Sequence, residues 1–100
     1  METVDINQAV MESLHTPGAI LLDVRTPQEY REGHLPGSRN LPLQSIGDAD
    51  GMISDEDTPI FVYCQSGARS SRAAIALREM GYSNIKDLGG ITAYKGNLEV

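Results

Sequence analysis

The chain has 100 residues, of which 40% are hydrophobic, and a formal net charge of -6 at pH 7. This length suits a single domain over residues 1–100 and leaves little apolar material for a second core. The negative charge disfavours general nucleic-acid binding, and no window approaches the roughly 20 apolar residues of a membrane span. The start of the chain is acidic and polar, unlike a secretory signal. We therefore expect a monomeric cytoplasmic protein with neither nucleic-acid nor membrane partners.

The N-terminal stretch "TVDINQAVMESL" predicts a short amphipathic helix. Ile6, Val10 and Leu14 recur at spacings of four, which places them on one helical face. Thr3 or Asp5 can cap the start of this helix. The "TPG" that follows ends it.

Two apolar runs predict buried strands, at residues 19–24 ("AILLDV") and 60–63 ("IFVY"). Nearly continuous apolar runs of this length are typical of strands covered on both faces in a parallel sheet. Between them, "TPQEYREG" at 26–33 has Thr26 and Glu29 at the spacing of a capping box, with proline at the first helical position. This segment is predicted as a short helix.

The remaining elements continue the alternation of strands and helices. Residues 39–43 predict a short strand, 70–82 a helix that ends at a glycine, and 84–88 another strand. Residues 47–59 are acidic and aperiodic, so an exposed loop with at most one helical turn is expected there. Residues 89–96 predict a turn and a final short helical segment. This order predicts an α/β domain with a mainly parallel central sheet flanked by helices.

Cys64 is the only cysteine of the chain and follows the second buried strand directly. It therefore lies at the carboxyl edge of the predicted sheet, where open α/β folds bind their ligands. The loop that follows it leads into a helix, so its backbone N–H groups lack intrahelical partners and can form an anion-binding nest. The residues of this predicted binding loop are Gln65, Ser66, Gly67, Ala68, Arg69 and Ser70.

A free cysteine at a strand end is most often a small buried apolar residue. Here, however, Gly67 permits a tight loop, and Arg69 and the helix dipole add positive charge near the sulfur. These features favour the thiolate and lower the thiol pKa. The pattern therefore indicates that Cys64 is a nucleophile.

Three stretches, "LLDVRTPQEYREGHLPGSRNLPL", "VYCQSGARSSRAAIALREMGY" and "LGGITAY", resemble successive signature segments of the rhodanese-like family of single-domain sulfurtransferases. The resemblance covers nearly the whole chain. It implies that Cys64 takes a sulfur from a donor such as thiosulfate, holds it as a persulfide, and passes it to cyanide or to a thiol, which could belong to a protein. It implies no cofactor.

Loop length separates this chemistry from its closest rival. Cysteine phosphatases that resemble the same fold have five residues between cysteine and arginine, whereas here four residues separate Cys64 from Arg69. A phosphoryl group presents three charged oxygens and needs the wider ring, and a single sulfur fits the tighter one. A phosphatase or arsenate reductase is thus disfavoured. A partner-specific persulfide carrier with little free turnover stays open.

Several other residues are predicted to support the site. By resemblance, Asp23 and Arg25 pair at the end of the first strand and brace the loop, although a simple strand-end ion pair explains them as well. Arg69 is also expected to hold the anionic donor as it arrives, and Arg72, one turn further along the helix, either assists it or lies on a solvated helix face. His34 is expected to be structural. One cysteine without clustered histidines and acids predicts no metal site.

Overall fold

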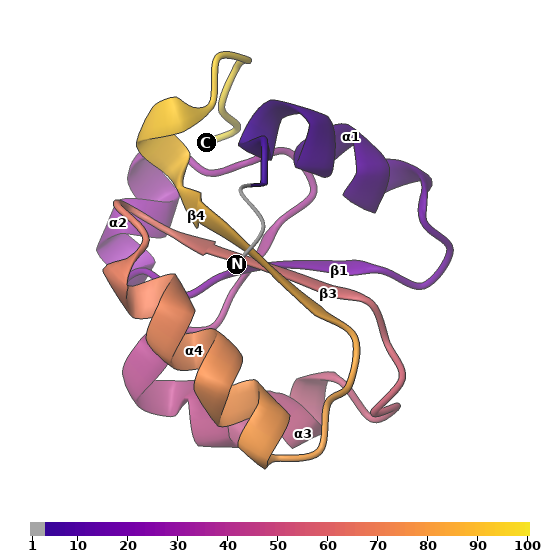
Figure 1. The fold of residues 1–100 in the computed structure, drawn as a ribbon. Coiled ribbons are helices and arrows are strands. Elements are labelled where there is room, and N and C mark those ends of the chain that lie inside the picture. Colours follow the sequence, from indigo (N-terminus) through magenta and orange to yellow (C-terminus); the bar gives the residue numbers. More distant parts are fainter. Residues whose placement is uncertain (1–3) are drawn as a thin grey trace.

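The computed structural model describes residues 4–100, and Figure 1 shows helices on both sides of a central sheet. In chain order the elements are α1 (Ile6–His15), β1 (Ile20–Asp23), α2 (Pro27–Glu32), β2 (Arg39–Asn40), the 3-10 helix η1 (Leu43–Asp48), α3 (Ala49–Met52), β3 (Ile60–Cys64), α4 (Ala68–Glu79), β4 (Ile85–Gly90) and the 3-10 helix η2 (Ile91–Ala93). Among these described residues no helix combines the length and apolar character needed to cross a bilayer.

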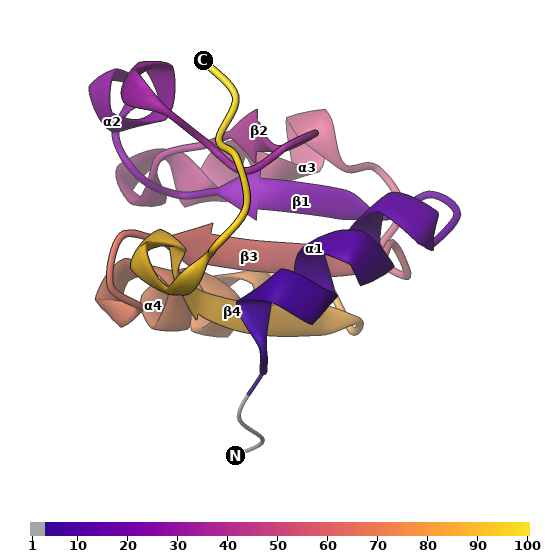
Figure 2. The same cartoon turned by 90° about the horizontal axis from the view of Figure 1, so that it is seen from above.

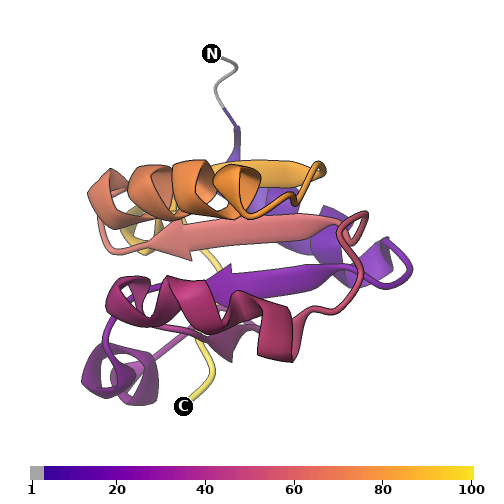
Figure 3. The same cartoon turned by 90° about the horizontal axis from the view of Figure 1, so that it is seen from below.

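The sheet is parallel and has the strand order β2-β1-β3-β4 within residues 4–100. The predicted α/β class is therefore confirmed. β3 is buried along its whole length, as its apolar run predicts. Because β1 and β3 point the same way, the side chains that end them meet at one edge of the sheet, and α2 lies at that edge (Figure 3).

Helices cover the two faces of the sheet and bury two separate apolar clusters. One face carries α1 and η2, and the other carries η1, α3 and α4 (Figures 1 and 2). The cluster on the α4 side includes Val62, Ala73 and Leu77, and the cluster on the α1 side includes Val10 and Phe61. Alternate residues of β3 thus pack on opposite faces and fix the strand, and with it Cys64, between two cores.

The predicted N-terminal helix is confirmed, but the expected burial of Leu14 is wrong. Leu14 is 54% exposed, and the buried face consists of Ile6, Ala9, Val10 and Ser13. A step of eight residues turns an α-helix by about 80° beyond two full turns, so Leu14 lies at the margin of the face centred on Ile6 and Val10. Asp5 caps the helix through Asn7 N–H, and Thr3 lies outside the described residues.

Three further boundaries differ from expectation. Of the segment 47–59, expected as an exposed loop with at most one helical turn, residues 47–52 are helical in η1 and α3, and Ala49 and Ile53 are buried in the core on the α4 side. The strand expected over residues 39–43 is limited to Arg39–Asn40, and η1 begins at Leu43. Gly89 and Gly90, expected in a turn, continue β4 because they pair with Tyr63 and Cys64 beyond a register shift that leaves Leu88 of β4 as the extra residue. The differences at residues 47–52 and 89–90 come from packing against distant elements, which overrides weak local preferences.

Candidate active site

Cys64 is the last residue of β3, and a three-residue loop joins it to α4. Gly67 caps this helix with a φ of 105°, a conformation that side-chain-bearing residues rarely adopt. That turn brings the Gly67 N–H to within 2.9 Å of the Cys64 sulfur. The helix therefore begins directly under the sulfur, with its unpaired N–H groups around it.

The loop favours the thiolate form of Cys64. Burial alone raises the pKa of the thiol, because Cys64 is only 1% exposed, but hydrogen bonds outweigh it and the pKa lies below its usual value. The donors are the hydroxyl and N–H of Ser70 and the N–H groups of Gly67 and Ser66. In the structure the Ser70 hydroxyl donates its single proton to the Gly67 carbonyl at 3.1 Å, so donation from this hydroxyl to the thiolate requires it to rotate.

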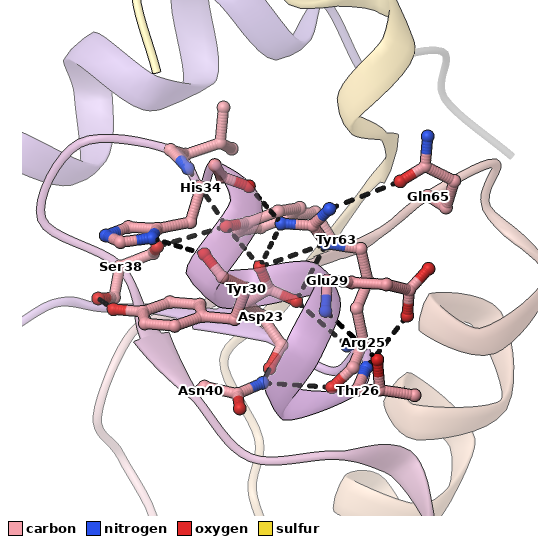
Figure 4. Close-up of polar contacts among 12 residues, drawn as sticks. Asp23, Arg25, Thr26, Glu29, Tyr30, His34, Ser38, Asn40, Tyr63 and Gln65 are labelled. Carbon is pink, nitrogen blue, oxygen red and sulfur yellow. Dashed lines mark hydrogen bonds and ion pairs between the residues drawn. The ribbon is translucent and has the colours of Figure 1, made fainter. Parts of the chain in front are cut away.

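A buried ion pair closes the end of β1 beside the loop (Figure 4). Arg25 is bonded to Asp23 through Nη2–Oδ2 at 2.8 Å and through Nε to both carboxylate oxygens at 3.1 Å. Arg25 also donates to the Gly33 carbonyl at 2.7 Å and to Gln65 Oε1 at 3.2 Å. The Tyr63 hydroxyl lies 2.7 Å from Asp23 Oδ2. The sequence-predicted pair thus forms, and through Gln65 it holds one residue of the Cys64 loop.

Arg69 lies in the first turn of α4 and is paired with Glu29 of α2. Its Nη1 is 2.7 Å from Glu29 Oε1, and its Nη2 is 3.0 Å from Oε2. This pairing lowers the pKa of Glu29 to about 2. The same Oε1 accepts the Thr26 N–H at 2.9 Å, which completes the predicted capping box. No local pattern indicated the contact with Arg69, since Glu29 already has a role in its own helix.

A cavity of about 400 Å³ lies beside the loop. It is lined by Arg25, Glu29, Glu32, Gly33, Gln65, Ile91 and Leu98. Leu98 reaches this position because the C-terminal segment bridges back to His34 through paired backbone hydrogen bonds of 2.9 Å. Glu32, Ile91 and Leu98 were not predicted from the sequence, because only the tertiary fold brings them to the site. Two other hollows, of about 280 and 590 Å³, lie away from Cys64.

The other candidates lie outside this cavity. Arg72 is exposed on α4. His34 stacks on Tyr30 with ring centroids 3.7 Å apart, and its Nδ1 lies 2.8 Å from the Tyr30 carbonyl oxygen, as expected of a structural histidine. Within residues 4–100 no group of three His, Cys, Asp or Glu side chains could hold a metal ion.

Comparison with known proteins agrees with this geometry. Residues 7–97 match the rhodanese-like domain family. An uncharacterised Bacillus subtilis protein is 40% identical over 82 residues, which cover 81% of this chain and 64% of that relative, slightly under two thirds of its length. The Escherichia coli thiosulfate sulfurtransferase PspE is 34% identical over 71 residues, covering 70% of this chain and 68% of that protein.

A solved structure described as a rhodanese with anions from Escherichia coli has a TM-score of 0.75 and 29% identity, and the match covers 81% of this chain and 96% of that one. The fold of that structure and the family match over residues 7–97 therefore point to the same family. The chain belongs to the rhodanese-like family.

Proposed function

We propose that this protein is a sulfurtransferase that carries a sulfane sulfur as a persulfide on Cys64. The observation that carries the proposal is the surroundings of the sulfur. Cys64 lies at the end of β3, accepts the Gly67 N–H at 2.9 Å, and has a lowered pKa. A nucleophilic thiolate is thereby available without a neighbouring histidine to remove its proton.

The proposed reaction has two steps. The Cys64 thiolate attacks the outer sulfur of thiosulfate, a sulfur–sulfur bond forms to Cys64, and sulfite leaves with the electron pair of the broken bond. Cyanide or a thiol then attacks the terminal sulfur and regenerates the thiolate. Between these steps the negative terminal sulfur of the persulfide needs hydrogen-bond donors, and the N–H groups of Gln65, Ser66 and Gly67 belong to the loop that can supply them.

The neighbouring residues have supporting roles in this proposal. Asp23 and Arg25 hold Gln65 and keep the loop in place. Ala68 and Ser70 form the first turn of α4 under the sulfur. Arg69 lies close to an incoming donor, with its charge shared with Glu29. Arg72 is one turn further along α4 and exposed, so we assign it at most a weak, long-range attraction for anions.

The test is an intact mass measured after incubation with thiosulfate. Wild-type protein is expected to gain the mass of one sulfur atom, and cyanide or dithiothreitol is expected to remove it. Cys64→Ser is the control and is expected to gain nothing. An unmodified wild-type mass, with the thiol shown to be reduced by titration, would contradict the proposal. A persulfide that forms but turns over slowly with cyanide would favour the partner-specific carrier.

A further inference from the structure

The positive charge of Arg69, in the first turn of α4, is already paired with the negative charge of Glu29. Two parallel hydrogen bonds join these side chains, one of 2.7 Å from Nη1 to Oε1 and one of 3.0 Å from Nη2 to Oε2. This bidentate geometry is the strong form of guanidinium–carboxylate pairing. The Arg69 side chain is 34% exposed and the Glu29 side chain 29%. The pair therefore lies at the surface, where an incoming molecule meets both charges together.

The remaining charges at the cavity are also paired or negative. Arg25 is bonded to the buried carboxylate of Asp23. Glu32 lines the same cavity as Glu29, and Arg25 is the one cation among the lining residues in the part of the chain that the structure describes. The cavity and its two ion pairs thus hold more carboxylates than guanidinium groups, and the Cys64 thiolate adds another negative charge. These side-chain charges repel a doubly negative donor more strongly than a donor with one negative charge or none.

We propose that Glu29 sets the charge selectivity of the Cys64 site. By holding Arg69 in an ion pair, Glu29 disfavours dianionic donors such as thiosulfate relative to sulfane donors that carry less negative charge. This inference rests on the sulfurtransferase function proposed above and names the donor class that the site prefers. Glu29 acts through Arg69 and does not need to contact the reacting sulfur, so it is a positioning residue.

Glu29→Gln isolates the charge of this side chain. A glutamine at this position can still accept the Thr26 N–H that Glu29 accepts at 2.9 Å, so the capping box of α2 is kept. Glu32→Gln removes the same charge from the same cavity without releasing Arg69. Glu79→Gln removes it from the last turn of α4, about 15 Å from Arg69.

The first readout compares alkylation of Cys64 by neutral iodoacetamide and by anionic iodoacetate. The Cys64 thiolate attacks the carbon of either reagent and displaces iodide, so a change in thiol pKa cancels in the ratio of the two rates. Wild type is expected to prefer iodoacetamide, and Glu29→Gln to weaken that preference about three- to tenfold at low salt. Arg69→Gln is expected to strengthen it by a similar factor. The double variant, which removes both charges of the pair, is expected to return close to wild type.

The second readout uses two sulfur donors, thiosulfate with two negative charges and methanethiosulfonate with one. Cys64 attacks the outer sulfur of either donor, which releases sulfite or methanesulfinate with the bonding electron pair. Glu29→Gln is expected to raise the kcat/KM ratio of thiosulfate to methanethiosulfonate about three- to tenfold, mainly through the KM for thiosulfate. Glu32→Gln and Glu79→Gln are expected to change the ratio less.

Two results would overturn the inference. One is a folded Glu29→Gln variant, with wild-type circular dichroism and melting, whose alkylation ratio is unchanged. The other is an Arg69→Gln variant whose alkylation ratio moves in the same direction as that of Glu29→Gln. An alkylation ratio that shifts as expected, with no persulfide formed from either donor, would uphold the charge selectivity and contradict the sulfurtransferase function.

Discussion

Replacing Gly90 with alanine is expected to displace the Cys64 loop without straining residue 90 itself. Gly90 has an extended backbone, with φ -106° and ψ 139°, which any residue can adopt. A Cβ atom there would lie 2.5 Å from the Gln65 carbonyl oxygen and 2.8 Å from the Ser66 Cα. Both are backbone atoms of the loop, so no side-chain rotation relieves the contact. The Gln65 carbonyl has to recede by about 1 Å to reach an ordinary contact distance near 3.5 Å.

Such a shift has consequences for stability and for reactivity. Overpacking of this kind costs about 1–3 kcal/mol of the free energy of unfolding. A misplacement of about 1 Å at a reacting group lowers rates by roughly 100-fold. We therefore expect Gly90→Ala to remain folded and to lose most of the rate of persulfide formation, measured in a single turnover with thiosulfate, together with the low thiol pKa measured by iodoacetamide alkylation against pH.

Gly89→Ala is the matched control. Gly89 has a φ of 80°, and a Cβ atom added there would meet no atom within 4 Å, so its alanine variant carries backbone strain without a clash. That strain costs about 1–3 kcal/mol but does not push on the loop. If Gly90→Ala formed the persulfide as fast as wild type, or if Gly89→Ala lost reactivity to the same extent, steric displacement of the loop by residue 90 would be refuted.

Three further predictions concern the groups around Cys64. Ser70→Ala removes a hydroxyl donor to the sulfur. It is expected to raise the thiol pKa and to slow iodoacetamide alkylation at pH 7 roughly tenfold. The control is Ser71→Ala, which changes an exposed serine. Asp23→Asn leaves the buried Arg25 guanidinium without its carboxylate and is expected to cost about 3–5 kcal/mol in urea unfolding; an unchanged midpoint would contradict this. Glu29 has a folded pKa of about 2 against an ordinary value of 4.5, so the unfolded state binds more protons between these values and stability falls as the pH drops from about 4.5 to 2. Glu29→Gln is expected to flatten that loss in acid unfolding curves.

Local patterns sufficed to predict the elements that carry the nucleophile. The apolar run before Cys64 predicted a buried strand, and glycine followed by strong helix formers predicted the tight loop and α4. The capping box at Thr26 and Glu29 also formed as predicted. In each case the residues that determine the local structure are close together in the sequence, so their spacing is enough to predict that structure.

Contacts between distant segments could not be predicted in this way. Glu29 and Arg69 are 40 positions apart, and they meet because α2 lies across the carboxyl edge of the sheet from the start of α4. Leu98 lines the cavity through the return of the C-terminal segment to His34. Gly90 was predicted as a turn residue. Its role in the structure is to leave room for the loop at Gln65 and Ser66, and this role depends on the register between β3 and β4.

The structure also separates two roles that the sequence pattern assigned jointly to Arg69. The donors that lower the Cys64 pKa are the Ser70 hydroxyl and the N–H groups of the loop, whereas Arg69 directs its guanidinium to Glu29. Stabilisation of the thiolate therefore depends mainly on the backbone and Ser70, with a Coulombic attraction from Arg69 beside them, and we propose that the ion pair controls which anions approach. Arg69→Gln is accordingly expected to change the thiol pKa less than Ser70→Ala does, yet to change the iodoacetamide-to-iodoacetate rate ratio more. The two quantities come from the same alkylation series measured against pH. If Arg69→Gln raised the thiol pKa by more than Ser70→Ala, the arginine would be the main support of the thiolate, and the division of roles would be wrong.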